Sequence, residues 1–308
     1  SPESAITEEE VQEILAANEG FICLDNIFER NFKQPLRKEH PEFYEKIKEM
    51  KMEEFVEHMM SLREKLDAFT LFKAEYSEAE KSIKRRQSVY WKEMLAVLSY
   101  AMNYPAKHLS AEDMLRLKKV LMPLISIVIA FVPQGSAREL LALYDAGVLS
   151  IIPVENDSSV IPNEAGGAVY RFKDENGNDT IVNYKMFISA VGQAPVLFND
   201  FPFPSLKTQG IISESSLKFS SPQNAQHEIE NGNELVFTQD KINYYLKVPG
   251  ISINDNFQVL DAHGVFNSNV YVMAVPLIAG LNPDYSGLDF CEAASKRIVK
   301  AMLDVNQL

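Results

Sequence analysis

The sequence is poor in cysteine, and the cysteines that occur are far apart. Among its 308 residues only Cys23 and Cys291 are present, and neither has a His or Cys neighbour at metal-ligand spacing. The sequence therefore predicts neither a disulfide framework nor a zinc site. This cysteine usage favours a reducing compartment, and we expect a cytoplasmic protein.

The sequence also lacks the glycine-rich motifs that hold phosphate groups. No two of its 13 glycines are separated by a single residue, so G-x-G-x-x-G cannot occur, and G-x-x-x-x-G-K-[ST] is absent as well. In such motifs, backbone amides at a helix N-terminus bind the pyrophosphate. We therefore do not expect this chain alone to hold a dinucleotide in the usual manner. G-x-S-x-G and H-E-x-x-H are missing too, which gives hydrolase and metalloprotease functions little support.

Positive charge is scarce. The chain has 43 Asp and Glu against 30 Lys and Arg, for a net charge of -13. Neither a nucleic-acid backbone nor an anionic membrane surface is an expected partner for such a chain. The basic cluster at residues 81–86 stands beside three glutamates, so we interpret it as a solvated helix face.

Long hydrophobic runs are missing. The longest, "VLMPLISIVIAFV" at residues 120–132, is interrupted by Pro123 and Ser126 and is shorter than the roughly 20 residues that cross a bilayer. We expect this run to lie in the core. The first residues, "SPESAITEEE", include neither an initiator Met nor the regions of a signal peptide. This suggests a chain that begins within a longer protein or has been processed.

The first half of the sequence predicts helices. Thr7 and Glu10 form a capping box before "VQEILAAN", and Gly20 is placed to end that helix. No glycine occurs between Pro41 and Tyr104, where apolar and charged residues recur at three- and four-residue spacing. Two or three amphipathic helices are expected in that stretch.

Two more capped helices are expected before the residue pattern changes from helical to strand-like. Ser110 is placed to begin one of them. For the other, Ser136 is a predicted N-cap and Gly147 a predicted C′ residue, which gives a helix at residues 137–146.

Strand patterns begin directly after this helix. "VLSIIPV" at residues 148–154 is apolar and rich in β-branched residues, and a hairpin is predicted around Asn176 and Gly177. Residues 186–191, within "YKMFISAVGQAP", predict an apolar strand that is covered on both faces of a sheet. Residues 195–262 are expected to be a loop-rich covering segment with one hairpin. The end of the chain predicts another strand in "GVFNSNVYVMAV" and a long amphipathic helix.

Together these patterns predict a mixed α/β protein. A helix-rich N-terminal half, residues 1–135, is followed by a Rossmann-like α/β part, residues 136–308, with hairpin and loop-rich insertions. The length of the chain makes two domains more plausible than one.

The second half resembles a known family from about Ala137 onward. "ISAVGQ" at residues 188–193 is similar to the "ATG"-like turn of flavoproteins with two dinucleotide-binding domains, which bind FAD and NAD(P). In that family the turn returns the chain to the FAD domain. "NVYVMAVPLIAGLNPDYSGLDFCEAASKRIVKAML" is similar to the strand, turn and helix that end those proteins. Ala274 and Val275 stand where that family has Gly and Asp, so this chain lacks the carboxylate found there.

The resemblance implies a function, cofactors and a site. It implies that the chain is the C-terminal portion of an oxidoreductase that binds FAD and NAD(P) in the full-length protein and a small-molecule substrate of open identity. Since the fingerprint is missing, the chain alone is expected to bind little or no cofactor. The residues that the resemblance places at the flavin are Val191, Gly192 and Gln193 in the first turn and Pro276, Gly280, Leu281 and Gly287 in the last.

Two other functions are compatible with the residues. In one, the α/β half is a scaffold without a cofactor and the aromatic stripe of "FYEKIKEMKMEEFVEHMM", residues 43–60, forms a partner-binding groove. Core packing is the simpler interpretation of that stripe. In the other, His263 acts with Asp261 in a hydrolase, although no nucleophile at a strained turn supports it.

Overall fold

The chain forms two compact units that interleave along the sequence. The structure is a computed structural model that describes residues 4–154, 157–164, 166–174, 176–192, 194–285 and 287–305. Unit 1 comprises Ser1–Lys65, Lys81–Phe131 and Ala194–Leu308, and unit 2 comprises Leu66–Glu80 and Val132–Gln193. The sequence-based boundary at residue 135 falls inside a helix of unit 2.

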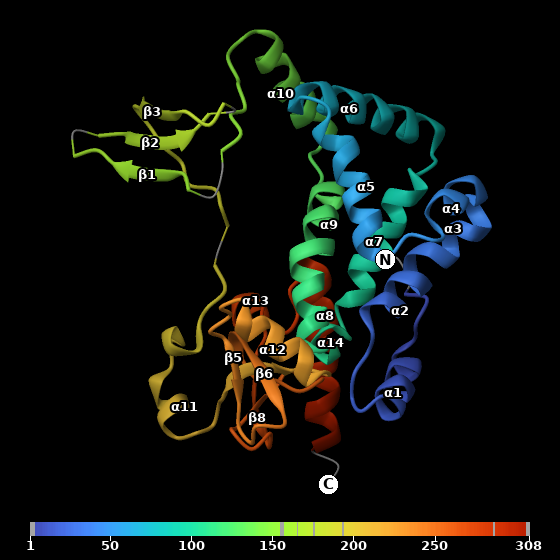
Figure 1. Cartoon of the computed structure of the whole chain (residues 1–308), viewed down its shortest axis with the longest axis vertical. Helices are drawn as coiled ribbons and strands as arrows, with labels where there is room; N and C mark the ends of the chain where they lie inside the picture. The colour runs from blue at the N-terminus through green and yellow to red at the C-terminus, as the bar shows by residue number, and fades with distance from the viewer. Residues whose placement is uncertain are drawn as a thin grey trace. The chain divides into compact units, whose positions relative to one another are not determined.

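The first part of unit 1 is helical, as predicted (Figure 1). Its helices are α1 (Glu8–Ala17), α2 (Leu24–Phe28), α3 (Gln34–Glu39), α4 (Pro41–Ile47), α5 (Met52–Glu64), α7 (Tyr90–Met102), α8 (Ala111–Arg116) and α9 (Met122–Ile129). π-Helical turns at Glu29–Lys33 and Leu117–Leu121 join α2 to α3 and α8 to α9. Helix α6 (Ala68–Arg85) begins in unit 2 and ends in unit 1.

The predicted helix caps of unit 1 are present. The Thr7 side chain accepts a hydrogen bond from the amide of Glu10, and the Glu10 carboxylate accepts one from the amide of Thr7. Gly20 has a φ of 86° and its amide donates to the carbonyl of Leu15. Ser110 accepts from the amide of Asp113 and begins α8. Local hydrogen bonding therefore starts and stops these helices where the sequence indicates.

The number of helices between residues 41 and 104 differs from the prediction. Four helices, α4 to α7, occupy this stretch instead of two or three. Asp67 explains one of the additional breaks, because its carboxylate accepts hydrogen bonds from the amides of Phe69 and Thr70 and so caps α6. The basic residues 81–86 lie at and just beyond the end of α6, and all but Ser82 are exposed.

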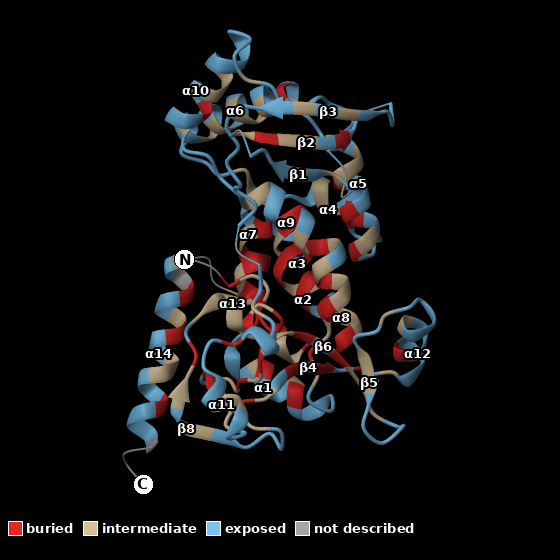
Figure 2. Cartoon of the chain, turned by 90° about the vertical axis from the view of Figure 1, so that its left-hand side faces the viewer, coloured by how far each residue is buried: buried red, intermediate tan, exposed pale blue. Residues whose placement is uncertain are grey.

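The core of unit 1 is formed by the helices together with the C-terminal strands (Figure 2). Leu121, Leu124 and Ile125 of the longest apolar run are fully buried in it, whereas Phe131 at the end of the run is 88% exposed. The stripe at residues 43–60 also belongs to this core, with Phe55 fully buried.

The C-terminal part of unit 1 carries two small antiparallel sheets. Strands β4 (Glu214–Lys218), β6 (Tyr244–Ile251) and β5 (Val236–Thr238) form one sheet in that order, and β7 (Gln258–Leu260) and β8 (Phe266–Tyr271) form the other. The helices that accompany them are α11 (Pro204–Thr208), α12 (Pro222–Glu230), α13 (Val275–Ile278) and α14 (Gly287–Val305). The predicted final strand and long helix are thus β8 and α14.

Two glycines allow α13 and the residue after it to lie directly against β6. A Cβ atom on Gly250, whose φ is 101°, would be 2.1 Å from the carbonyl oxygen of Leu277. A Cβ atom on Gly280 would be 2.1 Å from the carbonyl oxygen of Pro249 and 2.8 Å from a methyl group of Val248. Only glycine permits this approach of one backbone to another.

Unit 2 contains a three-stranded antiparallel sheet and two helices. Strands β1 (Ser159–Pro162), β2 (Ala168–Lys173) and β3 (Asp179–Tyr184) pair in sequence order. The predicted hairpin around Asn176 and Gly177 is confirmed, because β2 and β3 pair across it. The N-terminal part of α6 packs on α10 (Gln134–Asp145), where Lys73 pairs with Asp145 at 2.7 Å.

Three local predictions in unit 2 are wrong. Helix α10 begins at Gln134 after Pro133, so Ser136 is not its N-cap, although Gly147 follows its end with a φ of 69°. The predicted strands at residues 148–154 and 186–191 are not formed in the described residues, which have no strand partner there. Apolar content indicated strands, but a strand also requires a hydrogen-bonded neighbour.

The mixed α/β class with a helix-rich N-terminal half is confirmed. The strand arrangement differs from a Rossmann-like layer, since every pairing between the named strands is antiparallel. Among the described residues no single helix is long and apolar enough to span a membrane, and residues 111–129 with α10 satisfy that criterion only as a broken pair.

Candidate functional site

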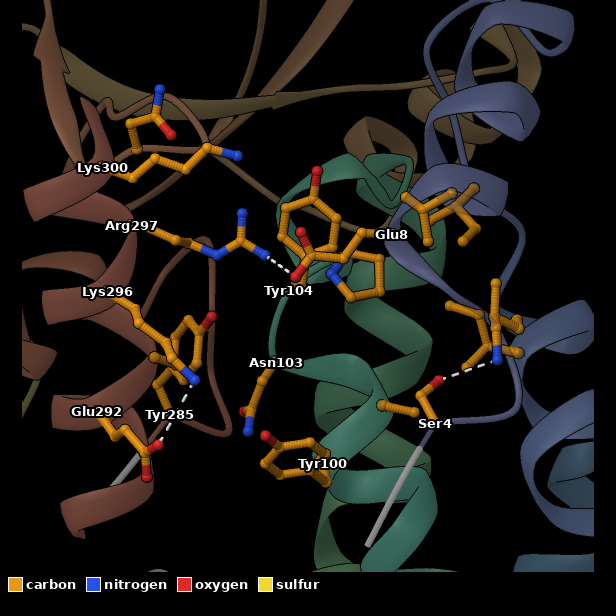
Figure 3. Close-up of a pocket in the computed structure, with 18 of the residues that line it drawn as sticks. Ser4, Glu8, Tyr100, Asn103, Tyr104, Tyr285, Glu292, Lys296, Arg297 and Lys300 are labelled. Atoms are coloured by element: carbon orange, nitrogen blue, oxygen red, sulfur yellow. Dashed lines mark hydrogen bonds and ion pairs between the residues drawn. The ribbon is translucent and has the colours of Figure 1, made fainter. Parts of the chain in front are cut away.

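A cavity of about 650 Å³ lies within unit 1. Its walls come from one face of α14, from the C-terminal end of α7 and the loop that follows, and from residues 4–27 of the N-terminal segment. Three tyrosines, Tyr100, Tyr104 and Tyr285, contribute rings to these walls (Figure 3). This volume is within the roughly 300–1,000 Å³ of typical small-molecule sites.

The charged residues of the cavity come mainly from α14. Arg297 forms an ion pair with Glu8, the first residue of α1, and its guanidinium carbon lies 4.1 Å from the centroid of the Tyr104 ring (Figure 3). Lys296 pairs with Glu292 of the preceding turn, with 3.7 Å between Nζ and Oε1. Lys300 forms no ion pair with any residue that the structure describes. The cavity thus offers aromatic rings, the Lys300 ammonium and several paired charges.

A partly buried charge cluster lies next to Tyr104. Asp255 accepts a hydrogen bond from the Tyr104 hydroxyl at 3.1 Å, and one of its oxygens lies 2.9 Å from both Lys107 Nζ and His108 Nε2. The Lys107 ammonium also donates to the carbonyl of Asn254 at 3.0 Å. The cluster therefore fixes the loop after α7 to the turn that precedes β7.

Burial and charge act in opposite directions on the pKa values of this cluster. Burial by itself raises the pKa of Asp255, but the hydrogen bond with His108 and the charge of Lys107 outweigh it and hold this pKa well below its usual value. Burial lowers the pKa of Lys107, and Asp255 opposes that change. Burial raises the pKa of the Tyr104 hydroxyl, and the negative charge of Asp255 raises it further.

The loop between α13 and α14 contains a second group of polar side chains. Asp284 accepts a hydrogen bond from the Ser99 hydroxyl of α7, and the Asn282 side chain donates to the carbonyl of Asn103 at 2.7 Å. Burial raises the pKa of Asp284 to about 6, against the effect of Ser99. The buried Oδ1 atom of Asn282 accepts no hydrogen bond from the described residues. Burial raises the pKa of Tyr285 to about 12. This residue of the loop lines the cavity.

Asp284 directly precedes Tyr285, a residue of the cavity wall, and a carboxyl group with a raised pKa is a candidate for proton transfer. At a pKa of about 6, Asp284 exchanges its proton near neutral pH. The sequence marked this segment only as a loop. The signal that could have revealed it is "NPDYSG", a polar stretch placed directly before a long helix.

The residues of the first predicted flavin turn lie in unit 2. Val191 is 93% exposed, and Gly192 has a φ of 81° with open space around its missing side chain. Gln193 lies outside the described residues. Val191 and Gly192 thus lie in an exposed bend of the chain.

The residues of the second predicted turn lie in unit 1, around α13 and the start of α14. Gly287 is the first residue of α14. The carbonyl of Pro276 accepts a hydrogen bond from the amide of Val196 at 2.9 Å. Leu281 is buried, and the space beside Gly280 is occupied by β6. Gly280 thus has a packing role that is sufficient to explain the glycine.

The alternative sites suggested by the sequence have ordinary structural surroundings. Asp261 accepts hydrogen bonds from the amides of His263 and Val265 and so stabilises a turn between β7 and β8. The most apolar side chains of the stripe at residues 43–60 are in the core, so they present no exposed groove. No group of three or more His, Cys, Asp or Glu side chains among the described residues is placed to hold a metal ion.

Comparisons with known proteins find a similarity in the helical part of the chain. A family model described as "YdhS-like middle domain" matches residues 7–129, from the N-cap of α1 to the end of α9. The chain is also 28% identical, over 199 residues, to "Uncharacterized protein YdhS" of Escherichia coli (strain K12).

The match covers only part of this chain and only part of the relative. It covers 64% of this chain and 36% of the relative, so the chain spans about a third of the relative's length. No solved structure matches the chain significantly. A large part of the E. coli protein therefore lies outside the matched region.

Proposed function

We propose that this chain is part of a flavin-dependent oxidoreductase that uses FAD and NAD(P), and that residues 282–285 and Gly287 belong to its flavin site. The observation that carries the proposal is the order of elements at the C-terminus. Strand β8, the short helix α13, a polar loop and the 19-residue helix α14 follow one another. This is the strand, turn and helix that the sequence resemblance to FAD- and NAD(P)-binding proteins implies.

Two features of the loop are compatible with a cofactor. The buried Oδ1 atom of Asn282 lacks a donor among the described residues, and a buried acceptor of this kind requires one. Helix α14 begins at Gly287, and the dipole of a long helix favours an anionic group near its N-terminus. Gly280 does not fit the same role, because the backbone of β6 fills the space beside it. This favours residues 282–285 and Gly287 as the contact residues.

The residues of the chain would bind and orient rather than perform the redox chemistry. When bound, the flavin would supply hydride and electron transfer. Asp284 would hold or release a proton near neutral pH, with its carboxyl oriented by the Ser99 hydroxyl. The Tyr285 ring would form part of the wall toward the cavity, which has a volume suited to a small-molecule substrate.

The test compares two polypeptides. One is the 308-residue chain, and the other is the polypeptide translated from the start codon of the gene. Visible absorption is recorded for each, and any cofactor released on denaturation is identified. A flavin bound to the polypeptide from the start codon supports the proposal, whereas a colourless protein with no released flavin contradicts it.

A matched pair of variants locates the contact at the first turn. Gly192 and Gly210 both have positive φ values, 81° and 68°, with nothing within 4 Å of the missing Cβ. Gly192→Ala and Gly210→Ala therefore introduce similar backbone strain. Only Gly192→Ala is expected to weaken FAD binding, by about tenfold or more, and equal binding in both variants would remove residue 192 from the site.

A further inference from the structure

One side of the cavity in unit 1 is apolar. Ile6, Val11, Ile22 and Ile27 of the N-terminal segment line it, and all four side chains also belong to the core. Ligand sites typically combine such apolar contact area with a few polar groups that orient the ligand. The isoleucine side of the cavity therefore suits an apolar body.

Another wall of the cavity is basic. Lys296, Arg297 and Lys300 share one face of α14 because they are three and four residues apart. Figure 3 shows their side chains directed from α14 toward α7. Arg297 is already neutralised by its ion pair with Glu8. The charges that remain for a ligand are the two lysines, which lie about one helical turn, roughly 6 Å, apart along the helix.

The acidic residues of the wall leave the middle of this basic face positive. Glu292 lies 3.7 Å from Lys296 Nζ, which is too long for a hydrogen bond, and its side chain is 75% exposed. Asp304, which is also exposed, follows Lys300 by one turn. An anion between the two lysines is thus closer to the ammonium groups than to either carboxylate. The carboxylates at both ends of the face favour a single negative charge over a double one.

Two tyrosine hydroxyls add hydrogen-bond donors to the same cavity. Tyr100 and Tyr285 both line it, and their hydroxyls form no hydrogen bond with any residue that the structure describes. Because burial raises the pKa of Tyr285 to about 12, this hydroxyl keeps its proton at neutral pH. Such a hydroxyl donates readily to a carboxylate oxygen.

We propose that the cavity binds an organic monocarboxylate with an apolar body. The carboxylate accepts hydrogen bonds from the two lysines and from the hydroxyls of Tyr100 and Tyr285, and the apolar body packs along the isoleucine side. This names the substrate class of the oxidoreductase proposed above. Only the word substrate rests on that proposed function, because binding of the carboxylate requires no flavin.

Five small probes test the charge and the apolar body separately. Phenylacetate has both, phenylacetamide lacks the charge, phenethylamine reverses it, phenyl phosphate increases it and acetate lacks the ring. Affinities are measured by ligand-observed NMR on the polypeptide translated from the start codon of the gene. Phenylacetate is expected to bind about tenfold more tightly than each of the others. No binding of phenylacetate up to about 10 mM, or equal or tighter binding of another probe, overturns the proposal.

A matched pair of variants locates the bound carboxylate. Lys300→Met removes a charge from the basic face of α14, and Lys119→Met removes one from an exposed lysine outside the described wall. Lys300→Met is expected to weaken phenylacetate binding about tenfold and to leave phenylacetamide binding unchanged. Lys119→Met is expected to change neither. Equal effects of the two variants on phenylacetate contradict the site.

A third variant tests the tyrosine donors. Tyr100→Phe keeps the ring and removes the hydroxyl, so it is expected to weaken phenylacetate binding about threefold or more without affecting phenylacetamide. Unchanged binding of phenylacetate removes this hydroxyl from the site. Circular dichroism of each variant shows whether the fold is retained.

The outcome can be separated from that of the proposed function. Flavin released on denaturation is measured on the same polypeptide. Selective binding of phenylacetate by a protein that contains no flavin supports the carboxylate site and contradicts the oxidoreductase. Bound flavin without binding of phenylacetate supports the oxidoreductase and contradicts the carboxylate site.

Discussion

Lys107 and Asp255 form an ion pair with 2.9 Å between Nζ and Oδ1, and the lysine side chain is only 7% exposed. The pair joins the loop after α7 to the turn before β7. His108 and Tyr104 bind the same carboxylate, and Tyr104 also forms part of the cavity wall. The cavity wall at Tyr104 therefore depends on the Asp255 carboxylate, which is bound by Lys107, His108 and Tyr104.

Removal of the Asp255 charge is expected to destabilise unit 1. Asp255→Asn leaves the Lys107 ammonium buried without its counter-charge, and breaking a buried pair in this way costs about 3 kcal/mol or more. Urea denaturation measures the change in the free energy of unfolding. Glu214→Gln is the control, because its pair with Lys247 is half-exposed and is expected to contribute less than about 1 kcal/mol. Similar losses in both variants would show that Asp255 has no special role.

Asp284 is expected to make the protein less stable as the pH rises from about 4 to about 6. Burial raises its folded-state pKa from 3.8 to about 6, so over this range the folded state keeps a proton that the unfolded state has lost. The free energy of unfolding then falls as the pH rises, by on the order of 2 kcal/mol. Asp284→Asn is expected to remove this decline.

The measurement is denaturant unfolding of the wild type and the variants at pH 4, 5, 6 and 7. Asp200→Asn is the control, because Asp200 is exposed in unit 1. It is expected to keep the decline of the wild type. A decline that persists in Asp284→Asn would assign it to another group.

Gly280→Ala is expected to destabilise unit 1 even when no cofactor is bound. The new methyl group would lie 2.1 Å from the carbonyl oxygen of Pro249, which requires β6 or α13 to move. We expect a loss of about 2 kcal/mol or more, as for other overpacked sites. Gly135→Ala, in an open helical position of α10, is expected to be neutral or slightly stabilising. Thermal denaturation followed by circular dichroism distinguishes the two variants. A Gly280→Ala protein with unchanged thermal stability would leave the approach of a cofactor as the reason for this glycine.

Arg297→Ala is expected to weaken the packing of α14 against α1 and the loop after α7. The variant loses the ion pair with Glu8 and the contact with the Tyr104 ring, together about 1 kcal/mol. Lys296→Ala changes the adjacent residue on the same helix, whose side chain is highly exposed. It is expected to change the free energy of unfolding by less than about 0.5 kcal/mol. Urea denaturation of the two variants gives this comparison, and equal effects would contradict the role of Arg297.

Local signals in the sequence predicted much of the fold. The capping box at Thr7 and Glu10, the cap at Ser110 and the hairpin at Asn176 and Gly177 are all present. Each depends on residues within a few positions of one another, so local spacing is sufficient to reveal it. The cap at Asp67 is equally local, and it divides the helices between residues 41 and 104 differently from the prediction.

The candidate site was not predictable in the same way. His108 and Asp255 are 147 residues apart, and no spacing rule connects them. The pKa of Asp284 depends on burial by residues from several elements. The packing role of Gly280 depends on the carbonyl of Pro249, and the composition of the segment gives no indication of that contact.

The sequence by itself determined the helix-rich first half, the helix caps at Thr7, Gly20 and Ser110, the hairpin of unit 2 and the apolar character of residues 186–191. These follow from dihedral preferences, caps and periodicity, which act over a few residues. Only the tertiary structure decided which charges are buried together, which glycines are enclosed by other backbones and which apolar segments remain uncovered. Those properties depend on what each residue contacts in space, because desolvation and strand pairing require partners from distant parts of the chain.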